Sequence, residues 1–218
     1  MGIVTELYHS SIGKKLVVGL TGLLLCIYLI VHLAGNLFLL KDDGGAAFDA
    51  YAELLPSLLI VRIIEFVLFG IFIVHAFAGV YVWILNKRAR PQNYKVSKAS
   101  ENSSLFSRTM FVSASIIFIF LIVHMRSFWF TSRFTTDEHF SMFATVKAAF
   151  TNSAYSLFYV VAMVLLGFHL KHGFQSAFQT FGLKTKKYAA LIEGVSVIFW
   201  LLVPLAFAAM PIYFLLKY

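Results

Sequence analysis

Five long apolar stretches run through this chain and leave few choices of fold. They cover approximately residues 16–40, 57–86, 106–130, 156–181 and 188–216. Each can cross a bilayer as a helix, which requires about 20 residues at a rise of about 1.5 Å each. A β-barrel would instead show short strands of alternating polarity. We therefore expect a single all-α domain over residues 1–218, an integral membrane bundle of five transmembrane helices.

The composition favours a membrane protein. Of the 218 residues, 60% are hydrophobic and 13% are charged, whereas soluble domains are about half apolar and about a quarter charged. The net charge of +8 does not indicate nucleic-acid binding, because the basic residues are confined to particular loops. The single cysteine, Cys26, offers neither a disulfide nor an iron–sulfur ligand set. The apolar run after Lys14 and Lys15 is too long for a signal peptide, so we expect it to be retained.

Lysines and arginines are divided unequally between the two predicted sides of the membrane. The side that holds the N-terminus and the second and fourth connections carries 11 of them, and the opposite side carries 5. By the positive-inside rule, we expect the N-terminus in the cytoplasm and the C-terminus outside.

One histidine lies inside each of the first four stretches, namely His32, His75, His124 and His169. An ionisable side chain in hydrocarbon is costly and marks a functional site by default. A single membrane histidine is as often a structural hydrogen-bond partner, but that role does not explain four at matched depths. Counted from the helix ends, His32 and His124 share the outer half, and His75 and His169 share the inner half. The sequence therefore predicts two histidine pairs, one above the other.

Two imidazoles that face each other across a bundle suit a six-coordinate haem, which carries electrons and has no open position for oxygen or substrate. Zinc sites usually include a carboxylate or thiolate, or gather several ligands at one level. Gly35, Gly79 and Gly173 lie three or four residues after a histidine, where a side chain would crowd a macrocycle. His172 lies three residues after His169, so either can ligate; otherwise His172 is an interfacial group or a contact to a haem propionate.

The segments VHLAGN, IVHAFAGVY, LIVHMR and GFHLKHGFQSAFQTFG follow one another on the first four stretches. In this order they resemble the dihaem cytochrome b membrane anchor subunit of succinate dehydrogenase and fumarate reductase, of the single-subunit five-helix type. The resemblance covers nearly the whole chain. Its most specific element is the fourth segment, in which His169 is followed by Gly173, Ser176 and Gly182.

The resemblance implies that the four helical histidines are the axial ligands of two b haems, an outer one at His32 and His124 and an inner one at His75 and His169. It also implies a flavoprotein subunit and an iron–sulfur subunit docked on the cytoplasmic face of a prokaryotic cell inner membrane. Electrons are then exchanged with a quinone, usually menaquinone. This chain has neither a flavin motif nor a cysteine cluster, so it is not catalytic alone. The segment MGIVTELYHSS and the basic inner loops would form the docking surface.

Quinone chemistry couples two electrons to two protons and requires a protonatable group near the outer haem. Glu53 is the candidate, with Asp49 beside it in sequence, and the alternative for both is a solvated loop acid. Glu65 lies well inside the second stretch, where Arg62 three residues earlier is expected to form an ion pair with it. The loop over residues 131–155 contains FSMFATVKAAF, which is either a short helix at the outer surface or part of a disordered loop.

Two cations and three tryptophans have weaker assignments. Arg126 and Lys171 each lie two residues after a paired histidine and are candidates for propionate contacts, although that spacing turns a side chain away from the ligand's face. Either can instead snorkel to an interface. Trp83, Trp129 and Trp200 are expected to be interfacial anchors.

Two other functions stay open. The cytochrome b subunit of a membrane hydrogenase, formate dehydrogenase or nitrate reductase uses similar haems, often with two histidines on one helix. A haem-free proton-coupled transporter requires broken helices around a midplane site, but Pro204 and Pro211 both fall in the fifth stretch, which has no histidine. Residue identities do not set the direction of the reaction, succinate oxidation or fumarate reduction.

Overall fold

The computed structural model describes residues 10–89 and 108–218, and every regular element in these ranges is helical. Within them, five helices are long and apolar enough to cross a membrane: Ile12–Leu40, Leu59–Arg88, Met110–Phe134, Ser153–Thr180 and Ala189–Lys217. The predicted all-α bundle with five spans is confirmed, and the span ends lie within a few residues of their expected positions. The expected start of the third span, at residue 106, lies outside the described residues.

The first, third and fifth spans are each composed of more than one element, and the second and fourth are single helices. The first is α2 (Ser11–Asn36) with the 3-10 turn η1 (Leu37–Leu40), the second is α4 (Leu59–Arg88) and the fourth is α10 (Ser153–Thr180). The third contains α7 (Met110–His124), the π-helical segment η2 (Met125–Phe130) and α8 (Thr131–Phe134). The fifth contains α11 (Ala189–Val197), the π-helical segment η3 (Ile198–Leu202) and α12 (Val203–Lys217).

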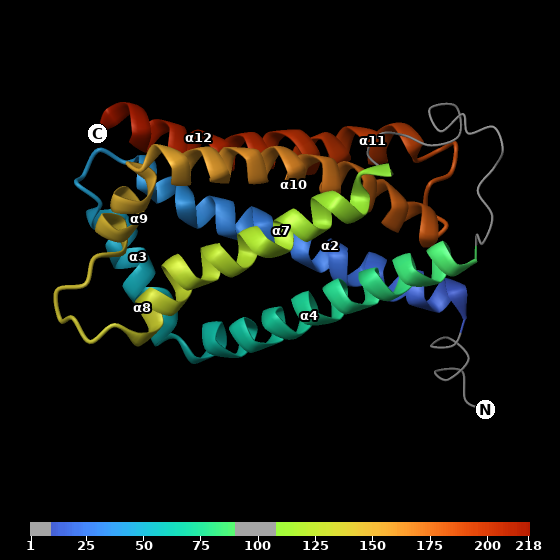
Figure 1. Ribbon diagram of the computed structural model, residues 1–218, viewed down its shortest axis with the longest axis horizontal. Coiled ribbons are helices and arrows are strands. Elements are labelled where there is room, and N and C mark those ends of the chain that lie inside the picture. Colours follow the sequence, from blue (N-terminus) through green and yellow to red (C-terminus); the bar gives the residue numbers. More distant parts are fainter. Residues whose placement is uncertain (1–9, 90–107) are drawn as a thin grey trace.

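The long helices run side by side, and α10 contacts α2, α7 and α12, while α4 packs on α2 (Figure 1). Two short helices, α3 (Ala46–Ser57) and α9 (Met142–Phe150), gather at the end of the bundle that holds the C-terminus. The FSMFATVKAAF segment thus contains a helix, which begins at Met142 after the capping residue Ser141. Its side chains Phe143, Val146 and Phe150 are buried, so α9 belongs to the core. The helix α3 was not anticipated from the sequence.

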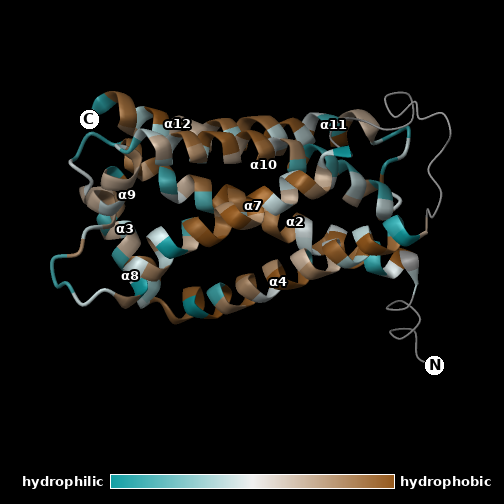
Figure 2. Cartoon of the chain, viewed as in Figure 1, coloured by the Kyte–Doolittle hydropathy of each residue, from teal (hydrophilic) through white to brown (hydrophobic). Residues whose placement is uncertain are grey.

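The outer surface of the spans is apolar. Figure 2 shows hydrophobic residues along the length of the bundle and hydrophilic residues concentrated toward its ends. On α4, Phe66 and Phe77 are 72% and 73% exposed, and none of the residues of this helix is buried. A soluble monomer rarely exposes such a large apolar face. The fold therefore indicates a multi-pass protein in a lipid bilayer.

Local signals set both ends of α10. Asn152 caps its N-terminus, because its side-chain oxygen accepts a hydrogen bond from the backbone N–H of Tyr155 at 3.0 Å. Gly182 follows the C-terminus with φ +71°, a left-handed conformation that favours glycine. The N–H of Leu183 then donates to the Phe178 carbonyl at 2.9 Å, which closes the helix end.

Asp49 connects the two short helices. Its carboxylate accepts hydrogen bonds from the Ser141 hydroxyl and the Phe143 backbone N–H, both at 2.7 Å. Ser141 in turn caps α9 by accepting from the Ala144 N–H at 2.9 Å. A carboxylate at a helix N-terminus is stabilising. Asp49 is therefore not the solvated loop acid that the sequence left open as an alternative, whereas Glu53 lies exposed on α3.

Gly167 permits a close contact between the fourth and fifth spans. A Cβ at this position would lie 2.7 Å from the backbone carbonyl oxygen of Trp200 in η3. Pro204, four residues after Trp200, has no N–H to donate to that carbonyl. The π-helical segment and the missing side chain together let α10 approach the fifth span two residues before His169.

We expect Gly167→Ala to lose about 1–3 kcal/mol of stability, because the new methyl group overlaps backbone atoms that cannot rotate away. Gly70→Ala is the matched control, since a Cβ there meets no atom within 4 Å. Thermal unfolding of both variants in detergent measures the difference. Equal melting temperatures would contradict the close contact.

Candidate functional site

The four histidines of the spans meet in two pairs inside the bundle. His32 on α2 and His124 at the end of α7 have ring centres 5.8 Å apart, and His75 on α4 and His169 on α10 have ring centres 6.2 Å apart. Both pairs meet edge to face, with interplanar angles of 85° and 75°. These are the pairings that depth along the helices predicts. Each pair joins helices that are not consecutive in sequence.

The donor set of each pair fits a haem. An imidazole nitrogen binds a metal ion at roughly 2 Å, so two imidazoles on opposite sides of one ion have ring centres about 6 Å apart. The two observed separations agree with this value. In residues 10–89 and 108–218, no group of three or more His, Cys, Asp or Glu side chains comes together. Each site thus offers two imidazoles, the axial set of a six-coordinate haem.

Thr21 favours one tautomer of the His75 ring. The Thr21 hydroxyl oxygen lies 2.7 Å from the Val17 carbonyl oxygen and 3.1 Å from His75 Nδ1. Because its single hydrogen is donated to Val17, the hydroxyl accepts from His75, and Nδ1 carries the ring hydrogen. The lone pair is then on Nε2. A Cβ at Gly22 would lie 3.0 Å from His75 Cε1, so the α2 backbone lies close to this ring.

Tyr159 is the corresponding partner of His124. Its hydroxyl lies 3.2 Å from His124 Nδ1 and 3.0 Å from the Tyr155 hydroxyl. Tyr159 is only 5% exposed and packs in an aromatic cluster with Phe120 and Phe150. Sequence reasoning missed both tyrosines. Their spacing of four residues on α10 predicts a shared helix face, but it does not say which helix that face meets.

The other two histidines have weaker contacts with the protein. Asn36 Nδ2 lies 3.4 Å from both ring nitrogens of His32, and the Tyr28 hydroxyl lies 3.5 Å from its Nδ1. These distances are at the limit of hydrogen bonding. His169 Nδ1 is buried and has no hydrogen-bond partner among the described residues. Among the described residues, no side chain or backbone group therefore fixes which nitrogen of the His169 ring carries the hydrogen.

The three glycines near the histidines differ in what they make room for. A Cβ at Gly35 would collide with the Tyr51 ring of α3. We expected this glycine to make room for a macrocycle, but it permits a close contact between α2 and α3. At Gly79 and Gly173, a Cβ would meet no atom closer than 3.9 Å. These two positions leave space beside His75 and His169.

The side chains proposed for haem propionates pack on aromatic rings. The Lys171 ammonium lies 4.0 Å over the Trp200 ring, and the Arg126 guanidinium lies 5.0 Å from the Phe130 ring centre. Trp200 lies in the middle of the fifth span and packs against buried core residues, which corrects its expected role as an interfacial anchor. His172 is half-buried one turn after His169, and the ring that contacts His75 is that of His169.

Glu65 has two partners within the membrane. Arg62 Nη1 lies 3.5 Å from Glu65 Oε2, which confirms the predicted ion pair. The indole N–H of Trp129 donates a hydrogen bond to the same carboxylate. Trp129 thus connects η2 to α4 in addition to any role as an anchor. The charge of Glu65 is compensated by the protein, as expected for a structural pair.

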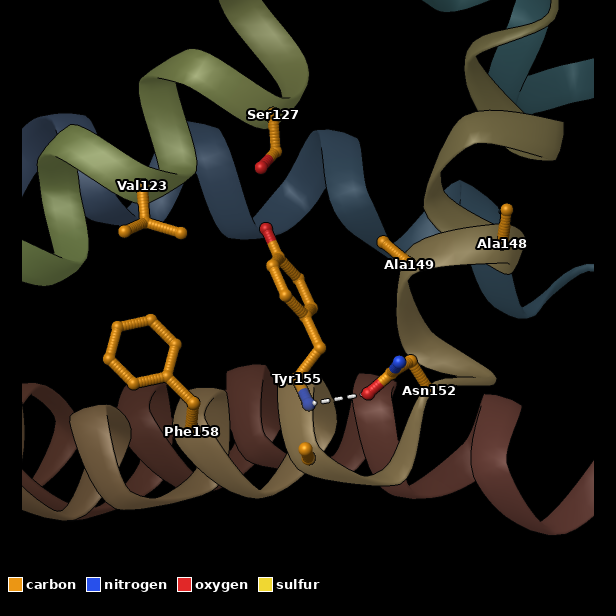
Figure 3. Close-up of a pocket in the computed structure, with 8 residues that line it drawn as sticks. Val123, Ser127, Ala148, Ala149, Asn152, Tyr155 and Phe158 are labelled. Atoms are coloured by element: carbon orange, nitrogen blue, oxygen red, sulfur yellow. Dashed lines mark hydrogen bonds between the residues drawn. The ribbon is translucent and has the colours of Figure 1, made fainter.

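A groove of about 580 Å³ lies beside the pair of His32 and His124, between η2, α9 and the start of α10. Its lining residues are Val123, Ser127, Ala148, Ala149, Asn152, Ala154, Tyr155 and Phe158. Figure 3 shows the Tyr155 ring extending across the groove, with its hydroxyl directed toward Ser127. Through Tyr159, this hydroxyl is connected to His124.

No protein-family model, curated protein or solved structure matches this chain. The site is therefore interpreted from its own geometry. His9 and most of the MGIVTELYHSS segment lie outside the described residues, as do residues 90–107, so the predicted docking surface stays a prediction.

Thr21→Val keeps the shape of the side chain but removes the acceptor for the His75 Nδ1–H group. We expect it to cost about 0.5–1.5 kcal/mol, the usual contribution of one hydrogen bond, because the Val18 carbonyl is a second acceptor for the His75 ring. Thr21→Ser keeps the hydroxyl and should retain most of the stability. Thermal unfolding in detergent compares the two variants, and equal losses would contradict the hydrogen bond.

Proposed function

We propose that this chain is the membrane anchor and electron-transfer subunit of a succinate:quinone oxidoreductase, with two b haems held by the four helical histidines. The observation that supports this most strongly is that histidines from four different helices meet as two separate imidazole pairs. Haem b, when bound between such a pair, supplies reversible one-electron oxidation and reduction.

The residues around the pairs orient the ligands. Thr21 and Tyr159 each lie against the Nδ1 atom of one histidine, which leaves Nε2 of that ring for the iron. Ten residues separate Gly22, beside the inner pair, from His32 in the outer pair. The same number separates Tyr159 from His169, so both helices put the two sites about 15 Å apart along the bundle.

Orientation and partners belong to the same proposal. With the N-terminus in the cytoplasm of a prokaryotic cell, the inner pair lies nearer the cytoplasmic side of the inner membrane. A flavoprotein and an iron–sulfur subunit would dock there, and a quinone such as menaquinone would exchange electrons near the outer pair. Glu53, exposed on α3, is the proposed proton group for the quinone. The chain has no role as an enzyme without these subunits.

A pyridine haemochrome assay on the purified full chain tests the proposal, together with identification of the subunits that co-purify with it. We expect two haem b groups per chain and a flavoprotein with an iron–sulfur protein. The absence of haem would overturn the proposal and favour a transporter. Two haems with subunits of a hydrogenase, formate dehydrogenase or nitrate reductase would replace the succinate assignment.

The ligand pairs can be separated by substitution. His169→Ala should leave one haem per chain, because His169 is the ring that contacts His75. His172→Ala should keep both haems, and His124→Ala should lose only the outer one. The ratio of haem to protein measures each effect. Loss of a haem in the His172 variant, with retention in the His169 variant, would reverse the assignment.

A further inference from the structure

The hydroxyls of Tyr159 and Tyr155 form a hydrogen-bonded chain whose direction His124 determines. When His124 binds iron through Nε2, its Nδ1 atom carries the ring hydrogen and donates it to the Tyr159 oxygen. Tyr159 then donates its own hydrogen to the Tyr155 oxygen, 3.0 Å away. The hydrogen of Tyr155 cannot point back toward Tyr159. It is available to an acceptor in the groove.

The groove suits a small apolar molecule that accepts a hydrogen bond. The groove is open along one side, and its volume of about 580 Å³ is within the range of small-molecule sites, about 300–1,000 Å³. Val123, Phe158 and three alanines supply apolar walls. The side-chain oxygen of Asn152 is already used to cap α10. The donor that the hydrogen-bonded chain directs into this space is the Tyr155 hydroxyl, near Ser127 (Figure 3).

The π-helical segment η2 explains why the groove lies beside the outer pair. It begins at Met125, immediately after His124, and carries Ser127 to the groove wall. A π-helical turn is wider than an α-helical one and occurs frequently at functional sites. Phe128 of the same segment is buried in the aromatic core with Tyr159, so the segment faces the ligand histidine and the groove together.

We propose that Tyr159 is a positioning residue for His124 and that Tyr155 donates a hydrogen bond to a carbonyl oxygen of a quinone bound in this groove. This inference rests on the proposed function and deepens it by assigning the quinone a place and a hydrogen-bond donor. Ser127 and Asn152 are the other polar side chains that line the groove. Glu53 does not line it, so in this arrangement Tyr155 donates to the quinone and Glu53 is a more distant proton group.

The role of Tyr159 is tested with Tyr159→Phe in the purified, haem-loaded full chain. Loss of the acceptor for Nδ1–H makes the imidazole a weaker electron donor, so the midpoint potential of the outer haem should rise and its ferric EPR signal should shift. Both haems should stay bound. Tyr81→Phe makes the same change on an exposed part of α4 and should alter neither readout. An unchanged outer-haem potential in Tyr159→Phe would overturn the positioning role.

The role of Tyr155 is tested by binding of dimethylnaphthoquinone to the full chain in lipid nanodiscs, measured by equilibrium dialysis. Tyr155→Phe should weaken binding by up to about tenfold, the usual contribution of one hydrogen bond. Ala148→Phe should abolish binding by filling the groove. Equal affinity in the Tyr155 variant, or full competition by a simple acyl detergent, would overturn the quinone assignment.

The two proposals fail in different ways. A protein without haem overturns the proposed function and the positioning role of Tyr159, while dialysis still measures whether a quinone uses the Tyr155 hydroxyl. A protein with two haems, an unshifted potential in Tyr159→Phe and unweakened binding in Tyr155→Phe keeps the proposed function and refutes this inference.

Discussion

A polar group without a partner costs several kcal/mol in hydrocarbon, and the arrangement of the whole bundle follows from this penalty. Backbone groups avoid it by forming helices. The imidazoles meet in pairs, and Thr21 and Tyr159 each lie against one ring nitrogen. The Glu65 carboxylate avoids this penalty by pairing with Arg62 and accepting a hydrogen bond from Trp129. Most of these contacts join two helices, so the few polar side chains also help to define which helices are neighbours.

The fourth span, α10, is central to both histidine pairs. It supplies His169 to the inner pair and Tyr159 to the outer pair, and it contacts α2, α7 and α12. Gly167 brings it close to the fifth span beside the inner pair. A displacement of this one helix would therefore alter both sites at once.

The two ends of the bundle differ in construction. At the end with the C-terminus, α3 and α9 are joined through Asp49 and packed on Phe214, which is fully buried. Through Ala148 and Ala149 of α9, this compact layer forms one wall of the groove. Toward the other end lie basic residues at the start of α2 and the end of α4, namely Lys14, Lys15, Lys87 and Arg88.

Length, hydropathy and residue spacing are local properties of the sequence. They were enough to predict the five spans, the pairing of the histidines by depth and the Arg62–Glu65 ion pair. Thr21 and His75 are 54 residues apart, and His124 and Tyr159 are 35 apart. Such contacts depend on how each helix is rotated about its axis. In a bilayer nearly every face of a helix is apolar, so the hydrophobic pattern that reveals rotation in soluble proteins is weak. The groove and the hydroxyl chain that reaches it therefore emerged only when the helices were packed together.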